Sequence, residues 1–183
     1  MIDIISSLDT RVLESLYTHR DFYTTNFLLG VSEMGGAILI CSLAVCISIF
    51  LASQKRYAYL AGFVVSSLGG VGSMYTLKHL IQRARPPVAY QAYIESGFSL
   101  PSGHATIATA FYGFCIYLIW HLVPPSTFRT FLTLGLGALI MSIAFSRLYL
   151  GVHYLSDVIA GLFLGGIFVW LGITIFRKLE NRG

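Results

Sequence analysis

The sequence predicts an all-α protein: a polytopic transmembrane helical bundle of five to six membrane helices with an amphipathic helix at its N-terminus. Of the 183 residues, 56% are hydrophobic and only 11% are charged, whereas a soluble domain carries about a quarter charged residues. The mean hydropathy of +0.75 is concentrated in runs of about 20 apolar residues, the length that a helix needs to cross a bilayer. Such runs are too long for the strands of a membrane barrel. We therefore predict a single membrane-embedded domain over residues 1–183.

The N-terminal segment, residues 1–25, differs from the rest of the chain. Apolar side chains recur in it at near-helical spacing with charged side chains between them: Ile5, Leu8, Val12 and Leu16, with Asp9, Arg11 and Glu14. This alternation predicts an amphipathic helix that lies in the membrane interface. The charges disfavour a true span. The alternative is that the segment forms a short, irregular first helix of a six-helix bundle.

The bundle itself is predicted to occupy residues 26–177, followed by a short tail over 178–183. Within it, five apolar segments are long enough to span a membrane, at roughly 27–51, 58–79, 103–122, 130–149 and 153–176. Their length and continuous apolar character favour helices over strands.

Basic residues predict the orientation of these spans, because cytoplasmic connections carry an excess of Lys and Arg. In a five-span bundle the 52–57 connection, the 123–129 connection and the C-terminal tail share one side, and all three contain basic residues. We assign this side, and with it the C-terminus, to the cytoplasm. The 80–102 loop and the 149–153 turn then face outward. They are also basic, which indicates a separate role for their charges.

Three polar clusters meet on the outer side: "KHLIQRARPP", "LPSGHAT" and "SRLYLGVHYLSD". They supply three cations, Lys78, Arg85 and Arg147, and these side chains bind phosphate as a compact charge or a planar fork. Ser102 and Gly103 open an apolar run, where the free N–H groups of a helix N-terminus bind anions and glycine allows close approach. The clusters therefore predict a binding site for a phosphate oxyanion.

Two histidines add reactive groups to this site. His153 and Asp157 are four residues apart and share a helix face, and a carboxylate on one ring nitrogen leaves the other free to attack. We predict His153 as the nucleophile, Asp157 as its orienting group and His104 as the acid that protonates the leaving oxygen. No metal and no cofactor are expected, because magnesium sites use carboxylates and the three cations supply the positive charge.

Two further charged residues need an interpretation. Arg83 is expected to contact solvent or lipid headgroups. Glu33 lies inside the first apolar run, where a carboxylate is costly and usually paired. We expect it to face the pocket as an accessory residue and to pair with a basic or hydroxyl group. The alternative is a helix–helix hydrogen bond remote from the site.

The motifs form an ordered pattern: Lys78–Arg85–Pro86, then Pro101–Ser102–Gly103–His104, then Ser146–Arg147–His153–Asp157. The pattern resembles that of the type 2 phosphatidic acid phosphatase superfamily of integral membrane lipid phosphatases. The resemblance implies a helical bundle with its site at the extracytoplasmic surface, attack by His153 on a lipid phosphate, and a phosphohistidine that water hydrolyses. It also implies phosphate-binding and accessory roles for the remaining motif positions: Lys78, Arg85, Ser102, Gly103 and Arg147, with Pro101 and Ser146 as accessory residues.

The implied protein is a metal-independent lipid phosphate phosphatase of a bacterial inner membrane, since so small a chain resembles bacterial members. Its candidate substrates are undecaprenyl pyrophosphate, phosphatidylglycerol phosphate and phosphatidic acid. One alternative is a lipid phosphotransferase that passes the phosphate to another lipid, and another is a non-catalytic lipid-binding or transport relative. The expected partners are the lipid substrate and the bilayer, without nucleic acid.

Overall fold

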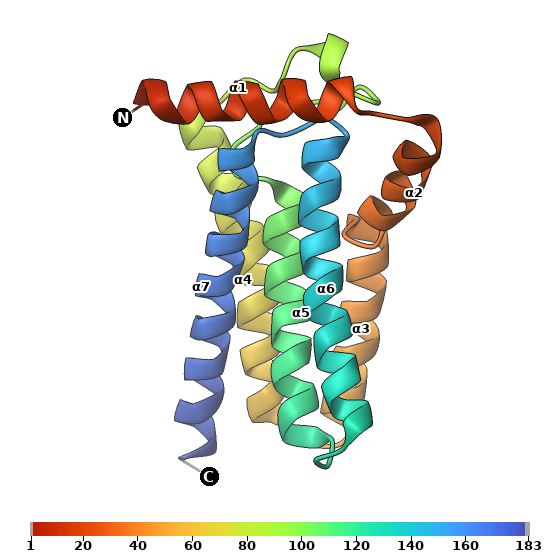
Figure 1. Ribbon diagram of the computed structural model, residues 1–183. Helices are drawn as coiled ribbons and strands as arrows, with labels where there is room; N and C mark the ends of the chain where they lie inside the picture. Colours follow the sequence, from red (N-terminus) through yellow and green to blue (C-terminus); the bar gives the residue numbers. More distant parts are fainter. Residues whose placement is uncertain (1, 182–183) are drawn as a thin grey trace.

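The computed structural model describes residues 2–181, with side chains for residues 4–181. Over this range the chain forms α-helices and one short 3-10 helix and has no strand (Figure 1). The elements in chain order are α1 (Ile2–Thr18), α2 (Phe22–Glu33), α3 (Ala37–Ser53), α4 (Tyr57–Ile81), η1 (Val88–Tyr90), α5 (Gly103–Leu122), α6 (Thr127–Tyr149) and α7 (Leu155–Glu180). The all-α prediction is confirmed.

In the part of the chain that the structure describes, five helical segments are long and apolar enough to cross a membrane: Phe22–Ser53, Tyr57–Ile81, Gly103–Leu122, Thr127–Tyr149 and Leu155–Glu180. These segments correspond one by one to the five predicted spans. The boundaries differ most at the first span, which begins at Phe22 and not near residue 27. At the last span, α7 begins after His153 and continues to Glu180. The start of the predicted tail is therefore helical, and residues 182–183 lie outside the described range.

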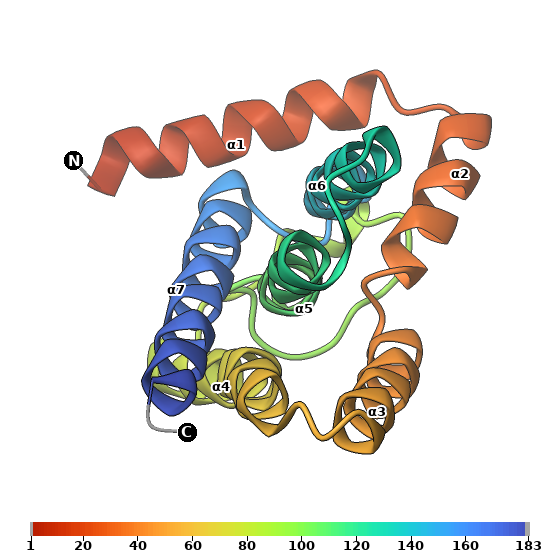
Figure 2. The ribbon, with the colours of Figure 1, turned by 90° about the horizontal axis from the view of Figure 1, so that it is seen from below.

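The first span is broken between α2 and α3, which point in different directions (Figure 1, Figure 2). The break requires glycine, because a Cβ on Gly35 would lie only 2.7 Å from Cγ2 of Ile143 on α6. α2 packs mainly against α6, whereas α3 packs against α4 and α5. The bend therefore folds the end of α2 over the bundle and brings Ser32 to the site described below.

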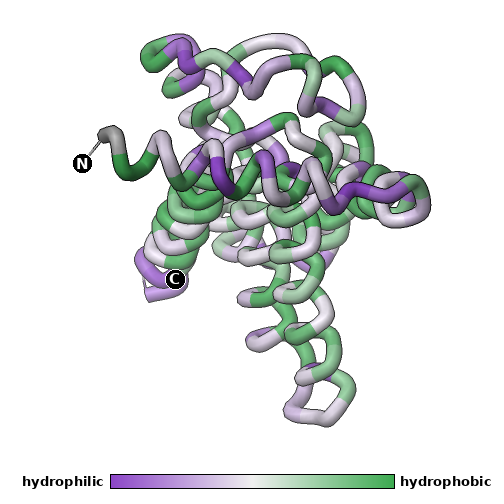
Figure 3. Tube along the Cα trace, turned by 45° about the horizontal axis from the view of Figure 1, so that its top comes forward, coloured by the Kyte–Doolittle hydropathy of each residue, from purple (hydrophilic) through white to green (hydrophobic). Residues whose placement is uncertain are grey.

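α1 lies across one end of the bundle, over α6 and α7 (Figure 1, Figure 2). Its Ile4, Ile5 and Leu8 are exposed while Leu13 is buried, and hydrophilic and hydrophobic residues alternate along it, unlike the mostly hydrophobic spans (Figure 3). It is not among the helices that could cross a membrane. These features support an amphipathic interfacial helix rather than a sixth span. Asp9 is an exception to the expected pattern, since it is only 2% exposed.

α5 occupies the centre of the bundle and packs against α4, α6 and α7 (Figure 2). Its Phe111 and Phe114 join Phe63 of α4 in the hydrophobic core. α4 and α7 approach each other closely, because a Cβ on Gly62 would lie 2.6 Å from the carbonyl oxygen of Gly172. This tightly packed frame fixes the end of α4 and the starts of α5 and α7 relative to one another.

Candidate active site

The three predicted clusters come together at the end of the bundle that α1 covers (Figure 1). The first two clusters border a cavity of about 430 Å³, to which the end of α4, the 82–102 loop and the start of α5 contribute Lys78, Arg85, Gly103 and His104. Arg147 and His153 lie directly behind this wall, because Arg85 contacts His153 and shares a carboxylate with Arg147. Residues far apart in sequence therefore form one site.

His153 and Asp157 form the expected pair, although not on a shared helix face. His153 precedes α7, and Asp157 is the third residue of that helix. The Asp157 carboxylate caps the helix by accepting the Tyr154 N–H at 2.9 Å and lies 3.6 Å from Nδ1 of His153. Ser99 supports the pair by donating to Asp157 and lying 3.4 Å from the same ring nitrogen. The pairing thus comes from a capping box.

The other ring nitrogen of His153 faces a cation. Nη1 of Arg85 lies 3.1 Å from Nε2 of His153 and donates to the carbonyl oxygen of Val152 at 2.9 Å. Because a guanidinium only donates, Nε2 is the acceptor and Nδ1 carries the proton. Burial, together with the charges of Arg147 and Arg85, lowers the pKa of His153 to about 4. The imidazole is therefore neutral at pH 7, with its lone pair on Nε2.

Arg147 is a fully buried cation with three side-chain acceptors. Its guanidinium donates to Ser32 Oγ and Tyr93 Oη, both at 2.6 Å, and to the carboxylate of Glu95. Buried charges are tolerated only when they are paired and hydrogen-bonded, so these groups, from α2 and the 82–102 loop, hold the guanidinium in place. None of the three was assigned a role from the sequence.

The 82–102 loop wraps around the other two cations. Nε of Arg85 donates to the carbonyl oxygens of Ser96 and Gly97, at 3.2 and 3.1 Å. Nζ of Lys78 donates to the carbonyl oxygens of Phe98 and Ser99. The backbone of this irregular loop therefore fixes the geometry of the cation cluster, which we define as Lys78, Arg85 and Arg147.

The start of α5 presents further groups to the site. The Ser102 N–H donates to the carbonyl oxygen of Asp157 at 3.0 Å, which ties the start of α5 to α7. Ser102 Oγ and Arg147 Nε are buried and have no hydrogen-bond partner in the described part of the chain. Since buried polar groups are normally paired, both atoms retain hydrogen-bonding capacity that the described residues do not use. Of the accessory residues, Pro101 is buried beside them, whereas Ser146 donates to its own helix at Ile143.

The predicted role of Glu33 is wrong. Glu33 is exposed and does not border the cavity, and its side chain has no hydrogen bond or ion pair to any residue whose side chain is described. Consecutive helix residues point about 100° apart, and it is the preceding residue, Ser32, that turns inward to Arg147.

The expectation for Arg83 is also wrong, because Arg83 is part of the site. It forms ion pairs with Asp157 at 2.6 Å and with Asp9 of α1 at 2.7 Å. Asp9 in turn accepts the Ser156 N–H at 2.9 Å and the Ser156 hydroxyl at 2.6 Å. The interfacial helix is therefore linked through two carboxylates and one arginine to the partner of His153. No sequence signal marked Asp9, because charged residues are expected on the polar face of such a helix.

We expect Arg83→Gln to lower kcat roughly ten-fold with little change in KM, because it loosens Asp157 without touching the cation cluster. The measurement is steady-state phosphate release by the purified protein, with Arg11→Gln as the control because Arg11 is exposed on α1. Equal kcat values for the two variants would show that Arg83 does not position the His153–Asp157 pair.

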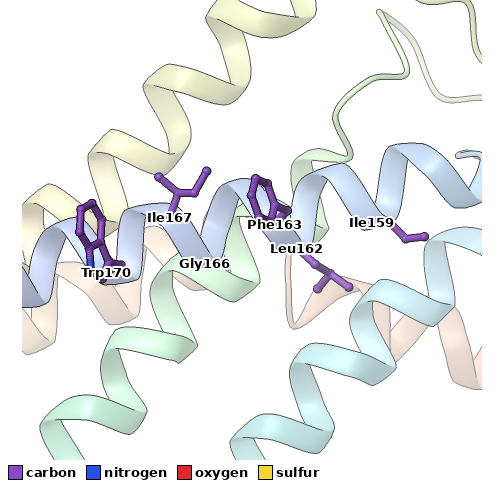
Figure 4. Close-up of a pocket in the computed structure, with 6 residues that line it drawn as sticks. All are labelled: Ile159, Leu162, Phe163, Gly166, Ile167 and Trp170. Carbon is purple, nitrogen blue, oxygen red and sulfur yellow. The ribbon is translucent and has the colours of Figure 1, made fainter.

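A second hollow lies on the outer surface of α7 and differs in chemistry from the site. Figure 4 shows its lining, which is entirely apolar: Ile159, Leu162, Phe163, Gly166, Ile167 and Trp170. Such a surface on a membrane helix is suited to contact with lipid chains.

In the described residues no three His, Cys, Asp or Glu side chains are grouped as a metal site would require.

The fold and the site together define a class: an integral membrane protein with a cation cluster beside a buried, neutral histidine at one end of its spans. Comparison with known proteins is consistent with this class. The sequence model of the PAP2 superfamily matches residues 57–181, and the chain belongs to this superfamily. It is a lipid phosphatase of the PAP2 type.

Individual relatives show how far the similarity extends. Phosphatidylglycerophosphatase B of Bacillus subtilis is 27% identical over 180 residues, covering 97% of this chain and 87% of the relative. A lipid A 4'-phosphatase of Bacteroides thetaiotaomicron is 34% identical over 117 residues, covering 58% of this chain and 48% of its own. The crystal structure of a transmembrane PAP2-type phosphatidylglycerolphosphate phosphatase from Bacillus subtilis superposes with a TM-score of 0.81 at 26% identity, covering 96% of this chain and 87% of that one.

Proposed function

We propose that the protein hydrolyses the terminal phosphate of a lipid phosphomonoester, with phosphatidylglycerol phosphate as the preferred substrate, through a phosphohistidine at His153. The observation that carries this proposal is the neutral His153 ring, whose Nε2 faces the cation cluster through Arg85 at 3.1 Å. The choice of lipid is supported by the near full-length similarity to a phosphatidylglycerophosphatase.

The proposed reaction has two steps. Lys78, Arg85 and Arg147 hold the phosphate, assisted by Ser102 and the free N–H groups at the start of α5. Nε2 of His153 attacks phosphorus, so a P–N bond forms, and the P–O bond to the lipid breaks as the leaving oxygen takes a proton from His104. His104 then removes a proton from water, the oxygen of which attacks phosphorus and breaks the P–N bond. Asp157 stabilises the charge that develops on the His153 ring.

The proposed reaction needs no metal, because three cations converge on the position of the phosphate. Phosphoryl transfer depends mainly on positioning and on neutralising charge, and the guanidinium and ammonium groups provide both. This part of the proposal predicts full activity in excess EDTA.

The cavity also has an apolar wall that suits a lipid substrate. Ala37 at the start of α3, Met74 and Tyr75 of α4 and Ile107 of α5 line it, and Tyr75 is 57% exposed on the outside of the bundle. A phosphate held by the cation cluster would therefore have its lipid chain between α3 and α4, toward the bilayer. We place this end of the bundle at the extracytoplasmic face, on the basis of the basic residues at the opposite end.

A panel of lipid phosphates tests the proposal. Purified protein in detergent with excess EDTA is given phosphatidylglycerol phosphate, phosphatidic acid or undecaprenyl pyrophosphate, and inorganic phosphate and lipid products are measured. We expect the highest kcat/KM with phosphatidylglycerol phosphate. A preference for undecaprenyl pyrophosphate would overturn the substrate assignment, and a newly phosphorylated lipid would indicate a phosphotransferase. Activity that depends on added magnesium would contradict the metal-free step.

A further inference from the structure

Glu95 lies between the two arginines of the cation cluster. Its Oε1 accepts from Nη2 of Arg85 at 3.2 Å, and its Oε2 accepts from Nη2 of Arg147. The hydroxyl of Tyr93 donates to Oε2 at 2.9 Å. The carboxylate therefore bridges the two guanidinium groups, and the same Arg85 guanidinium contacts Nε2 of His153. A bridging anion at this point occupies the place where a phosphate would lie to be attacked.

The neighbouring arginines keep the carboxyl group of Glu95 ionised. Burial alone would raise the pKa of this carboxyl, but the charges of Arg147 and Arg85 outweigh it and lower the pKa to about 2. The carboxylate is thus ionised at every pH at which the protein would act. It is also near the surface, since its side chain is 21% exposed, compared with 1% for that of Arg147.

The Glu95 side chain can be displaced without a change in the backbone around it. Glu95 lies in the irregular stretch between η1 and α5, where its own N–H donates to the side chain of Gln91. The carbonyl oxygens of Ser96 and Gly97 accept from Arg85 and hold the backbone of this stretch in place. The carboxylate would therefore leave the two arginines by rotation of the partly exposed Glu95 side chain, and not by movement of the backbone.

We propose that Glu95 is an internal counter-anion of the phosphate site: an incoming phosphate binds Arg85 and Arg147 by displacing the Glu95 carboxylate. The free energy of this displacement sets how strongly an anion must interact with the two arginines in order to bind. This inference rests on the proposed function, because it takes the cation cluster to be the phosphate site. A ligand that binds only the displaced state has its affinity reduced by the fraction of protein in that state. The need to displace Glu95 therefore weakens the binding of every anion by a common factor.

Weaker binding of all anions favours terminal phosphates over the phosphodiesters of ordinary phospholipids. A terminal phosphate carries a charge of about −1.5 to −2 and three acceptor oxygens, whereas the phosphodiester of an ordinary phospholipid carries a single charge. A terminal phosphate still interacts strongly enough with the arginines to displace Glu95, whereas the abundant phosphodiesters do not. Glu95 thereby keeps the bulk lipid of the bilayer from occupying the site.

The test compares Glu95→Gln with the wild type and with Glu180→Gln, a matched control that is exposed at the far end of α7. Dissociation constants for inorganic phosphate and dimethyl phosphate are measured by titration calorimetry in detergent. We expect Glu95→Gln to bind both anions about ten-fold more tightly, because it loses a charge-assisted competitor. Turnover of this variant should also become sensitive to added phosphatidylglycerol, whereas turnover of the wild type should not.

Unchanged or weaker binding of both anions by Glu95→Gln would overturn the inference and make Glu95 a support for the arginines. Should that variant not yield folded protein, Glu95→Asp keeps the charge with a shorter reach and should give a smaller tightening of the same sign. Lys78→Gln separates this inference from the proposed function, because Lys78 belongs to the cation cluster but donates to backbone carbonyls and not to Glu95. If phosphate binding to otherwise wild-type protein is unchanged both by Lys78→Gln and by Arg147→Ala, the cation cluster is not the phosphate site and the proposed function fails as well.

Discussion

Replacing His153 with alanine should abolish phosphate release, with a fall in kcat of roughly four orders of magnitude or more. In the described structure His153 combines a buried, neutral ring with an Nε2 lone pair beside the cation cluster, and no other side chain combines these properties. The loss should be in kcat and not in phosphate binding, because the cation cluster remains in place. The measurement is the release of inorganic phosphate from a lipid phosphate under saturating conditions.

His121→Ala is the control for this prediction. His121 is exposed near the end of α5 remote from the site, so the same substitution should leave turnover within about two-fold of the wild type. A His153→Ala variant that retains activity within ten-fold of the control would remove His153 from the role of nucleophile.

Arg147→Ala should be the most damaging change among the residues of the cation cluster, since it affects both activity and stability. The substitution removes a cation that is 0% exposed and leaves Glu95 without one of its two ion pairs. Breaking a buried pair in this way costs about 3–5 kcal/mol. We expect a clear fall in Tm in detergent and a fall in kcat/KM of roughly a thousand-fold or more.

Arg147→Lys separates the two effects of Arg147. It restores the charge but not the planar fork, so we expect partial recovery of Tm with little recovery of kcat/KM. Arg129→Ala is a control on the opposite end of α6, where the side chain stacks on Trp120. Wild-type kcat/KM in Arg147→Lys would show that the fork is not used to bind phosphate.

The sequence predicted the helical class, the five spans and the convergence of three motifs, because each depends on a local pattern. Apolar runs determine the spans, and alternating topology then places the motifs at the same end of the bundle. The pairing of His153 with Asp157 was predicted for the wrong reason, since the spacing reflects a helix cap and not a shared helix face.

The site residues that were not predicted from the sequence lie where irregular or amphipathic segments pack against the bundle. Glu95 and Ser99 lie in a loop without periodicity, and only its folded path around Lys78 and Arg85 brings them to the site. Asp9 looked like a residue of the polar face of α1, yet docking of that helix buries it against Arg83. Ser32 and Glu33 differ by one helical position, and the break after α2 decides which of them faces inward.

Docking of α1 links the membrane interface to the His153–Asp157 pair. The exposed apolar side chains Ile4, Ile5 and Leu8 suit insertion into the interface, while Asp9 on the same helix holds Arg83 and Ser156. The amphipathic helix therefore contributes a fixed hydrogen-bonding group to the site in addition to an anchor.

Trapping the phosphorylated enzyme tests most directly whether a phosphohistidine forms at His153. The purified protein is mixed with lipid phosphate labelled in its terminal phosphate, quenched within milliseconds in alkali, and examined for label bound to the chain. We expect alkali-stable, acid-labile label that maps to His153 and is absent from His153→Ala. Label on another residue, or steady hydrolysis with no label in the wild type at any quench time, would contradict it.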